Sequence, residues 1–291
     1  MNQSNLWTPA RRIEQNFARA MRRLAKRIAA LVKGITDPQR IIEELRRFSQ
    51  TKEFREYAAA VAGKMITGLF RDMGRTWRQA AAANGRGREL YQALMRELRV
   101  TGRGAQLDEL ITDTTYRIVT LPETIGKDVA AYVEREALKG RRASDIEREI
   151  QQMFPEHTAA RAELIARTQV SYTQTNLIRT RAESLGLNWY VWRAAGGGKG
   201  DGRTRHAHKA MSGVIVGWDD PPAPEDLFPR FTKTGRPYRN TLGHYHAGQA
   251  PNCRCYPEPI VDADLVTWPA RLYRNGRIVI VTRKQFEQIT R

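Results

Sequence analysis

Apolar residues recur every three or four positions from residue 8 to about residue 186, which is the spacing of one face of an α-helix. In the clearest case a single stripe is formed by Ile13, Phe17, Met21, Leu24, Ile28 and Leu31. Pro9 precedes this stretch and Gly34 follows it, as proline and glycine commonly do at the two ends of a helix. The pattern predicts a mostly helical N-terminal region.

The remaining face of this first helix is strongly basic. Against a single acid, Glu14, it carries Arg11, Arg12, Arg19, Arg22, Arg23, Lys26, Arg27 and Lys33. The whole chain has a net charge of +18, which favours a polyanionic partner such as nucleic acid, an anionic membrane or an acidic protein. The face is either a binding surface for such a partner or an ordinary solvated surface. Its candidate contact residues are Arg12, Arg19, Arg22, Arg23, Lys26 and Arg27.

Further helices are predicted in "IIEELRRF", in the stretch from "FREY" to "QAAAA", in "ELYQALMRELRV", over 105–120, over 123–139 and from Ser144. "SDIE" has the pattern of a capping box, with Ser144 as N-cap and Glu147 reaching back to it. Another helix is expected to begin near Glu156 and to end at Gly186. No repeat of fixed period is found, which argues against a solenoid.

The character of the sequence changes after Gly186. "NWYVWRA" and "VIVGW" are β-branched and aromatic, as in strands, and "TRHAHKAMSG" between them predicts a short helix. Prolines and glycines dominate residues 219–257 and predict an ordered but irregular region. "RLYRNGRIVIVT" predicts a hairpin with Asn275 and Gly276 in a type I′ turn, followed by a short helix. The fold class is therefore α+β, with a helical region over 1–155, a compact module over 156–265 and a hairpin with a helix over 266–291.

The sequence contains no predicted signal peptide and no predicted membrane-spanning segment. Its first residues lack the apolar core of a signal peptide, and no run approaches the roughly 20 apolar residues of a spanning helix. Two cysteines cannot form a disulfide framework. We therefore expect a protein made in a reducing cytoplasm, with a membrane not expected among its partners.

Both cysteines lie in "APNCRCYPEP", and four of the five histidines lie between residues 206 and 246. Cys253 and Cys255 project to the same side of an extended segment, so they and an imidazole such as that of His208 can share one ion, with zinc as the metal. The alternative is that they are small buried residues that flank a turn without a metal. A disulfide between them requires a strained ring and is disfavoured.

Asp201, Arg203, Arg205 and His208 form a polar cluster after a glycine loop. Arginines with a histidine can clamp a phosphate, and together with His244 and His246 they suggest a metal-dependent nuclease. In the alternative interpretation, Asp201 pairs with an arginine and ties the loop together. Carboxylates that could hold magnesium are sparse here, which favours the structural interpretation.

The order of these motifs resembles the phage Mu F-like head morphogenesis family, also called minor capsid proteins. "LIARTQ", a tryptophan-containing strand, "DGRTRHAHKAMSG" and "PNCRC" follow one another over roughly residues 125–260. The signature positions that match are Asp201, Arg203, Arg205, His208, Gly213, Cys253, Arg254 and Cys255. The sequence departs from the family pattern at Gln169, where glutamate is more usual, and in the longer "GGGKG" loop.

The resemblance implies a non-enzymatic structural protein of the head of a tailed bacteriophage. Members of the family are associated with the portal vertex inside the head and with DNA packaging or delivery. The implied partners are the portal protein, the major capsid protein and packaged double-stranded DNA, the last held through sequence-independent contacts to phosphate. Alternative functions are a nuclease built on the His/Cys cluster and a membrane-active ejection protein that uses the basic helix. No cofactor is expected other than a structural zinc ion at His208, Cys253 and Cys255.

Overall fold

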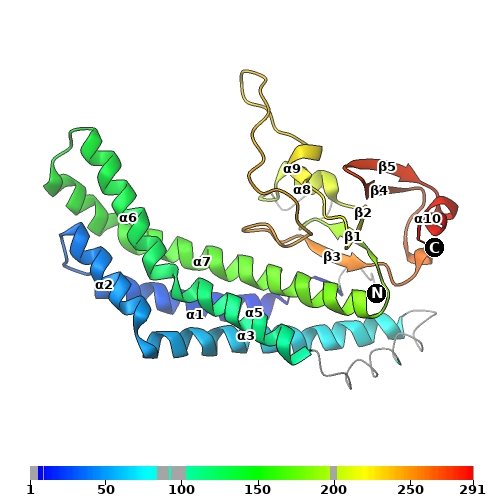
Figure 1. The fold of residues 1–291 in the computed structure, drawn as a ribbon, viewed down its shortest axis with the longest axis horizontal. Coiled ribbons are helices and arrows are strands. Elements are labelled where there is room, and N and C mark those ends of the chain that lie inside the picture. The colour runs from blue at the N-terminus through cyan, green and yellow to red at the C-terminus, as the bar shows by residue number, and fades with distance from the viewer. Residues whose placement is uncertain (1–5, 9, 84–91, 93–102, 197–201, 291) are drawn as a thin grey trace. The chain divides into compact units, whose positions relative to one another are not determined.

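The computed structural model describes residues 6–8, 10–83, 92, 103–196 and 202–290 and shows an α+β protein (Figure 1). It divides into two compact units. The helical unit comprises Arg11–Gly68 and Gly102–Gln169, and the sheet unit comprises Met1–Ala10, Leu69–Thr101 and Val170–Arg291. The sheet unit is therefore discontinuous in sequence. The expected boundary near residue 155 falls inside a helix.

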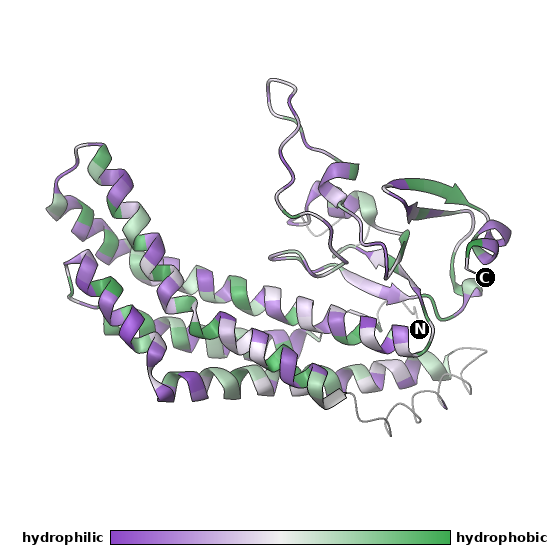
Figure 2. Cartoon of the chain, in the orientation of Figure 1, coloured by the Kyte–Doolittle hydropathy of each residue, from purple (hydrophilic) through white to green (hydrophobic). Residues whose placement is uncertain are grey.

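The helical unit is built from amphipathic helices whose apolar stripes form its core. Its complete helices are α1 (Arg11–Leu31), α2 (Pro38–Gln50), α5 (Arg103–Val119) and α6 (Leu121–Leu138). It also contains α3 (Lys52–Ala82) up to residue 68 and α7 (Ala143–Ser184) up to residue 169. In α1 the buried residues are Phe17, Ala20, Met21, Leu24, Ala25 and Ile28, which are the predicted stripe without its two ends and with two alanines added. Figure 2 shows hydrophilic and hydrophobic residues alternating along these helices.

Helix α2 packs against α6, and local capping fixes where α2 begins. The Asp37 carboxylate accepts a hydrogen bond of 2.9 Å from the Gln39 N–H, and Pro38 occupies the first turn, where its missing N–H costs nothing. At the contact with α6, Gly126 lies 3.8 Å from the Ile42 side chain, measured from the position that a Cβ atom would take. The close approach lets the two helices share their apolar faces.

Two predicted boundaries in this region are wrong. Helix α7 begins at Ala143, so Ser144 lies inside its first turn and does not act as the N-cap of a capping box. The helix expected to start near Glu156 is the continuation of the same helix, which runs through Pro155. The proline lacks an N–H and removes one helical hydrogen bond, but buried Phe154 and Ala162 on either side keep the helix packed. The predicted helix "ELYQALMRELRV" lies outside the described residues except for Gln92.

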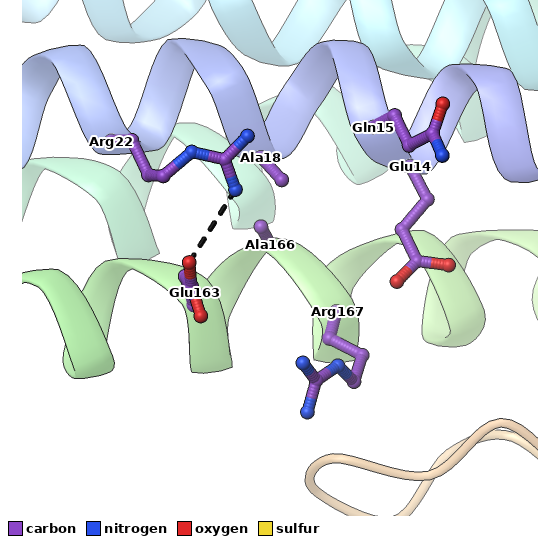
Figure 3. A pocket seen from close by; sticks show the side chains of 7 residues that line it. All are labelled: Glu14, Gln15, Ala18, Arg22, Glu163, Ala166 and Arg167. Carbon is purple, nitrogen blue, oxygen red and sulfur yellow. Dashed lines mark hydrogen bonds and ion pairs between the residues drawn. The ribbon is translucent and has the colours of Figure 1, made fainter.

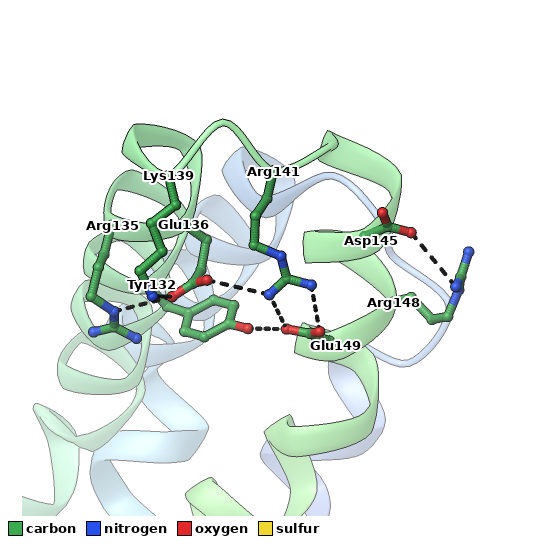
Figure 4. A network of polar contacts seen from close by, with 8 residues as sticks. All are labelled: Tyr132, Arg135, Glu136, Lys139, Arg141, Asp145, Arg148 and Glu149. Atoms are coloured by element: carbon green, nitrogen blue, oxygen red, sulfur yellow. Dashed lines mark hydrogen bonds and ion pairs between the residues drawn. The ribbon is translucent and has the colours of Figure 1, made fainter.

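A polar network joins the end of α6 to the start of α7 (Figure 4). Glu136, whose side chain is 7% exposed, accepts hydrogen bonds from Lys139 at 2.9 Å and from Arg141 at 3.2 Å. Arg141 also forms a two-pronged ion pair with Glu149, and Tyr132 donates to the same carboxylate. Hydrogen bonds from Lys139 lower the pKa of Glu136 to about 2, and hydrogen bonds from Arg141 lower the pKa of Glu149 to about 2.

These lowered pKa values predict that acid destabilises the helical unit. Below the ordinary carboxyl pKa of 4.5, unfolded Glu136 and Glu149 take up protons while the folded carboxylates stay ionised. The stability that they provide is complete above pH 4.5 and is lost as the pH falls to about 2. We expect urea midpoints, followed by far-ultraviolet circular dichroism, to fall less steeply over this range in Glu136→Gln. Asp145→Asn, which removes an exposed pair with Arg148, is the matched control, and equal slopes in both variants would contradict the prediction.

The sheet unit surrounds a five-stranded mixed sheet. Its elements are β1 (Trp189–Arg193), α8 (His206–Met211), β2 (Val214–Gly217), α9 (Pro224–Leu227), β3 (Tyr256–Pro259), the 3₁₀ turn Ala263–Leu265, β4 (Ala270–Arg274), β5 (Arg277–Val281) and α10 (Arg283–Ile289). The C-terminal parts of α3 and α7 belong to this unit as well. The strand order is β3-β1-β2-β4-β5, with β2 parallel to β4 and the other neighbours antiparallel.

The sequence predicted β1, α8, β2 and the terminal hairpin, and these are confirmed. Asn275 and Gly276 have φ values of 50° and 76°, as a type I′ turn requires, and the hairpin pairs Arg274 with Arg277. Strand β3 was not predicted, because its sequence is YPEP. It lies at the edge of the sheet and pairs only with β1, a position in which prolines are tolerated.

Candidate functional site

The site lies in the sheet unit, where α8 meets the segment that leads into β3. Helix α8 follows the glycine loop and places His208 on its buried side. Cys253 and Cys255 immediately precede β3 and are 3% and 2% exposed. The structure thus brings together three of the signature residues, of which His208 is 45 and 47 positions from the two cysteines in the sequence. No other group of potential metal ligands is found in the part of the chain that the structure describes.

Both sulfur atoms approach the same nitrogen of His208. The Nδ1 atom lies 3.4 Å from the Sγ of Cys253 and 3.5 Å from the Sγ of Cys255. The ligand atoms of the three residues all lie within 4.8 Å of one another. Both cysteines are free thiols, and the Cys255 N–H donates to the Sγ of Cys253 at 3.3 Å. The disulfide that was disfavoured from the sequence is absent from this pair.

The other ring nitrogen of His208 faces a tyrosine and a carboxylate. Tyr245 donates its hydroxyl proton to Oε2 of Glu225 at 2.6 Å, so the tyrosine oxygen accepts from Nε2–H of His208 at 2.8 Å. Glu225 also lies 3.6 Å from the same nitrogen through Oε1. This chain fixes the proton of neutral His208 on Nε2 and leaves the lone pair of Nδ1 directed at the two sulfurs.

The charges in this buried cluster stabilise one another. Burial alone would lower the pKa of His208, but its hydrogen bonds with Cys253 and Glu225 outweigh burial and raise that pKa. The pKa of Cys253 is lowered by hydrogen bonding from Cys255 and His208, against the effect of burial. The hydrogen bond to Cys253, together with burial, raises the pKa of Cys255. The cluster therefore eases the ionisation of the Cys253 thiol and opposes that of Cys255.

The cysteine segment is held in place by the C-terminal part of α7. Thr175 donates to the Ala247 carbonyl at 2.7 Å, and Gln249 donates to the Asn176 side chain at 3.2 Å. Gly248 between them has a φ of 91°, and a Cβ atom there would lie 2.5 Å from the Thr175 hydroxyl and 2.8 Å from the Cys255 carbonyl. The backbone then passes through Asn252, at a φ of 59°, and turns into Cys253.

The remaining signature positions support this arrangement or lie outside it. Arg205, just before α8, donates to the Pro251 carbonyl at 2.9 Å and so links the helix to the cysteine segment. Gly213 has a φ of 84° and donates its N–H to the Trp192 carbonyl at 2.8 Å. Arg203 is exposed and Arg254 is half-buried. Asp201 lies outside the described residues, so its expected pairing with an arginine stays a prediction.

The other two histidines of the suggested nuclease have surroundings that differ from those of His208. His246 is buried, lies 3.2 Å from the Tyr190 hydroxyl and 3.4 Å from Arg179, and has its pKa lowered to about 4 by burial and by that arginine. His244 is exposed and bonds the Pro221 carbonyl at 2.8 Å. Among the described residues, neither joins the group of potential metal ligands around His208.

The six predicted contact residues of α1 are all exposed, as their interpretation as a binding surface requires. Three of them also have contacts within the helical unit. Arg19 donates to the side-chain oxygen of Asn16. Arg22 lies 3.4 Å from Glu163, and the Arg27 guanidinium lies 5.2 Å from the centre of the Phe48 ring. A surface pocket of about 250 Å³ lies between α1 and α7 beside Arg22 (Figure 3). Its charged lining residues are two acids, Glu14 and Glu163, and two arginines, Arg22 and Arg167, so their formal charges cancel.

Sequence reasoning missed Glu225, Tyr245 and Thr175, which orient the cluster without belonging to a recognised motif. The only available signal was local: Tyr245 lies between two histidines in "GHYHAG". In the described parts of the chain, no helix is long and apolar enough to cross a membrane.

Comparison with known proteins gives one match. Residues 127–257 match the model of the family described as Phage Mu protein F like protein, a range that contains the whole His/Cys cluster. No curated protein matches this chain, and no solved structure does. The match confirms the resemblance found in the sequence and indicates a phage protein related to the head. Residues 127–257 of this chain are thus similar to the Phage Mu protein F like family.

Proposed function

We propose that this chain is a non-enzymatic minor head protein of a tailed bacteriophage that lies at the portal vertex inside the head and contacts the packaged DNA. The proposed DNA contact is supported chiefly by the basic face of α1. Its apolar stripe is buried in the core of the helical unit, so the exposed cations face outward. The family match supports the role in the head.

The charge pattern of α1 suits phosphate better than a small anion. The cations lie along a helix of 21 residues, which is about 30 Å long and extends past many phosphates of a duplex. Contacts of this kind are independent of base sequence, as packaging of a whole genome requires. They release counterions, so the affinity depends steeply on salt.

A second basic surface lies in the sheet unit, in the loop of residues 228–240. The backbone turns back on itself there. The backbone N–H of Thr232 donates to the Arg236 carbonyl, and the backbone N–H of Tyr238 donates to the Arg230 carbonyl, both at 2.8 Å. Figure 1 shows this loop as a long excursion from the sheet. Its cations are all exposed, and the chain contains no acidic residue between Asp226 and Glu258. They are Arg230, Lys233, Arg236 and Arg239.

The first test is salt-dependent binding to duplex DNA of arbitrary sequence. We expect Arg12, Arg19, Arg23 and Lys26, changed together to glutamine, to lower the slope of log affinity against log salt by roughly 3 to 4, because each phosphate contact contributes about 0.9. Arg22 and Arg27 are left in place, since they contact Glu163 and Phe48 within the helical unit. Fluorescence anisotropy at several salt concentrations gives the slope.

The matched control removes four other exposed cations, each of which has an acidic partner three or four residues away. These are Arg47, Lys52, Arg75 and Arg148. Because each is locally neutralised, the control slope is expected to stay within one unit of the wild type, the contribution of a single phosphate contact. An equal loss in both variants, or a wild-type affinity that does not depend on salt, would contradict the DNA contact.

The role in the head is tested in particles of the phage that encodes this chain. We expect quantitative mass spectrometry to find the chain in DNA-filled heads at a small fraction of the copy number of the major capsid protein. Crosslinking inside intact particles should join it to the portal protein. A chain that is absent from both procapsids and finished particles would overturn the proposal.

A further inference from the structure

We propose that His208, Cys253 and Cys255 bind one zinc ion that joins α8 to the segment before β3. The ligand set is the first reason. Two thiolates and an imidazole are soft and borderline donors that favour zinc over magnesium or calcium. All three residues are buried, with exposed fractions of 2% to 3%.

The spacing of the donors matches a tetrahedral ion. With zinc–sulfur and zinc–nitrogen distances of about 2.3 and 2.0 Å and tetrahedral angles, sulfur and nitrogen lie about 3.5 Å apart. The distances from Nδ1 to the two sulfurs are 3.4 and 3.5 Å. A thiol hydrogen bond has a similar length, but the single lone pair of Nδ1 satisfies only one thiol. Two sulfurs that converge on one ring nitrogen are explained by an ion between the three atoms.

The protonation state is also the one that a metal needs. Because Tyr245 uses its proton on Glu225, the Nε2 proton of His208 points to the tyrosine oxygen, and Nδ1 presents its lone pair to the sulfurs. A histidine that binds a metal commonly donates its other N–H to a group of this kind, which fixes the ring. Glu225 and Tyr245 are therefore positioning residues. Three protein donors leave one position of a tetrahedral ion for a donor outside this set.

The ion would connect two parts of the chain that are far apart in sequence. His208 is on α8, the cysteines precede the edge strand β3, and the proline-rich stretch that begins near residue 219 links them. The N–H of Cys255 already points at the Sγ of Cys253, as backbone N–H groups do at zinc-bound thiolates. This function is independent of the basic face of α1, which belongs to the helical unit.

The test is metal content and cobalt spectroscopy of the full chain. We expect about one zinc per chain after purification without chelator. Replacement by Co²⁺ should give the thiolate charge-transfer band and the intense visible bands of a tetrahedral site. Cys253→Ser, Cys255→Ser and His208→Gln should each abolish stoichiometric binding. His206→Gln changes an exposed histidine on the same helix and should bind as the wild type does.

A second measurement needs no variant and so is independent of whether the variants fold. The chain has only two thiols, so a thiol reagent in mild urea reports on this site alone. With zinc bound, both thiols should react slowly, and a chelator should expose both together. Less than about 0.2 zinc per chain after reconstitution, with thiol reactivity and thermal unfolding unchanged by chelator, would overturn the proposal.

Variants of the two positioning residues, Glu225 and Tyr245, test the geometry of the zinc site. Glu225→Gln and Tyr245→Phe should retain one metal per chain but bind it 10- to 100-fold more weakly in competition with a chromophoric chelator. Their cobalt bands should shift, because the orientation of the imidazole changes, whereas Glu258→Gln, at a buried carboxylate on β3, should leave the bands unmoved. DNA binding should be unaffected by chelation, so the zinc proposal and the DNA contact can fail separately.

Discussion

Gly248→Ala is expected to destabilise the sheet unit by about 2 to 5 kcal/mol. At a φ of 91°, a side chain with a Cβ atom is strained before any contact is considered. The new atom would then meet the Thr175 hydroxyl at 2.5 Å and the Cys255 carbonyl at 2.8 Å. The hydroxyl is held by the Ala247 carbonyl and the second contact is backbone, so neither can move without displacing the cysteine segment.

Tryptophan fluorescence measures this loss selectively. All six tryptophans belong to the sheet unit, so urea unfolding followed at their emission reports on that unit alone. Gly243→Ala is the matched control: its φ is 67°, but nothing lies within 4 Å of its Cβ position. It should lose only about 1 kcal/mol through the backbone. If Gly248→Ala lowers the free energy of unfolding by no more than this control does, the close packing of Gly248 against Thr175 of α7 is contradicted.

Trp7→Ala is expected to cost about 3 to 5 kcal/mol, which is typical of a large aromatic removed from a core. Trp7 is 2% exposed and packs edge-on against Trp77 of α3, with ring centroids 4.8 Å apart. Its carbonyl accepts a hydrogen bond of 2.9 Å from Gln174 of α7. Removing the indole leaves a cavity between these elements, so amide hydrogen exchange should accelerate at the end of α3.

The conservative variant Trp7→Phe keeps an aromatic ring against Trp77 and should lose less than half as much stability. Leu6→Ala changes the preceding, half-buried residue and serves as the control for the segment itself. The prediction fails if Trp7→Ala unfolds at the same urea concentration as Leu6→Ala.

The helices and the terminal hairpin could be predicted because their causes are local. The apolar stripe of α1 and the two positive φ angles at Asn275 and Gly276 are properties of short stretches. Pro155 misled the prediction for the same reason. A local rule ends the helix there, whereas the buried residues around it keep α7 continuous.

The residues that support the candidate site could not be predicted because their contacts are long-range. Cys253, Cys255 and His208 stand out by their type and by the resemblance, but Glu225 and Tyr245 acquire their roles only through the path of the loop between residues 219 and 257. Trp7 belongs to no periodic pattern, so only the fold shows that it is buried. Strand β3 forms despite two prolines because β1 offers it an edge.

Because the sheet unit is discontinuous in sequence, its segments become available for folding at different times during translation. The helical unit has all its segments once residue 169 has left the ribosome, and it can fold while the rest of the chain is still being made. Residues 6–8 and the C-terminal part of α3 must wait for residues 170–291, which complete their unit. Until residues 170–291 have been made, Trp7 and Trp77 lack the rest of the unit to which they belong, and Gln174, which bonds the Trp7 carbonyl, is not yet in place.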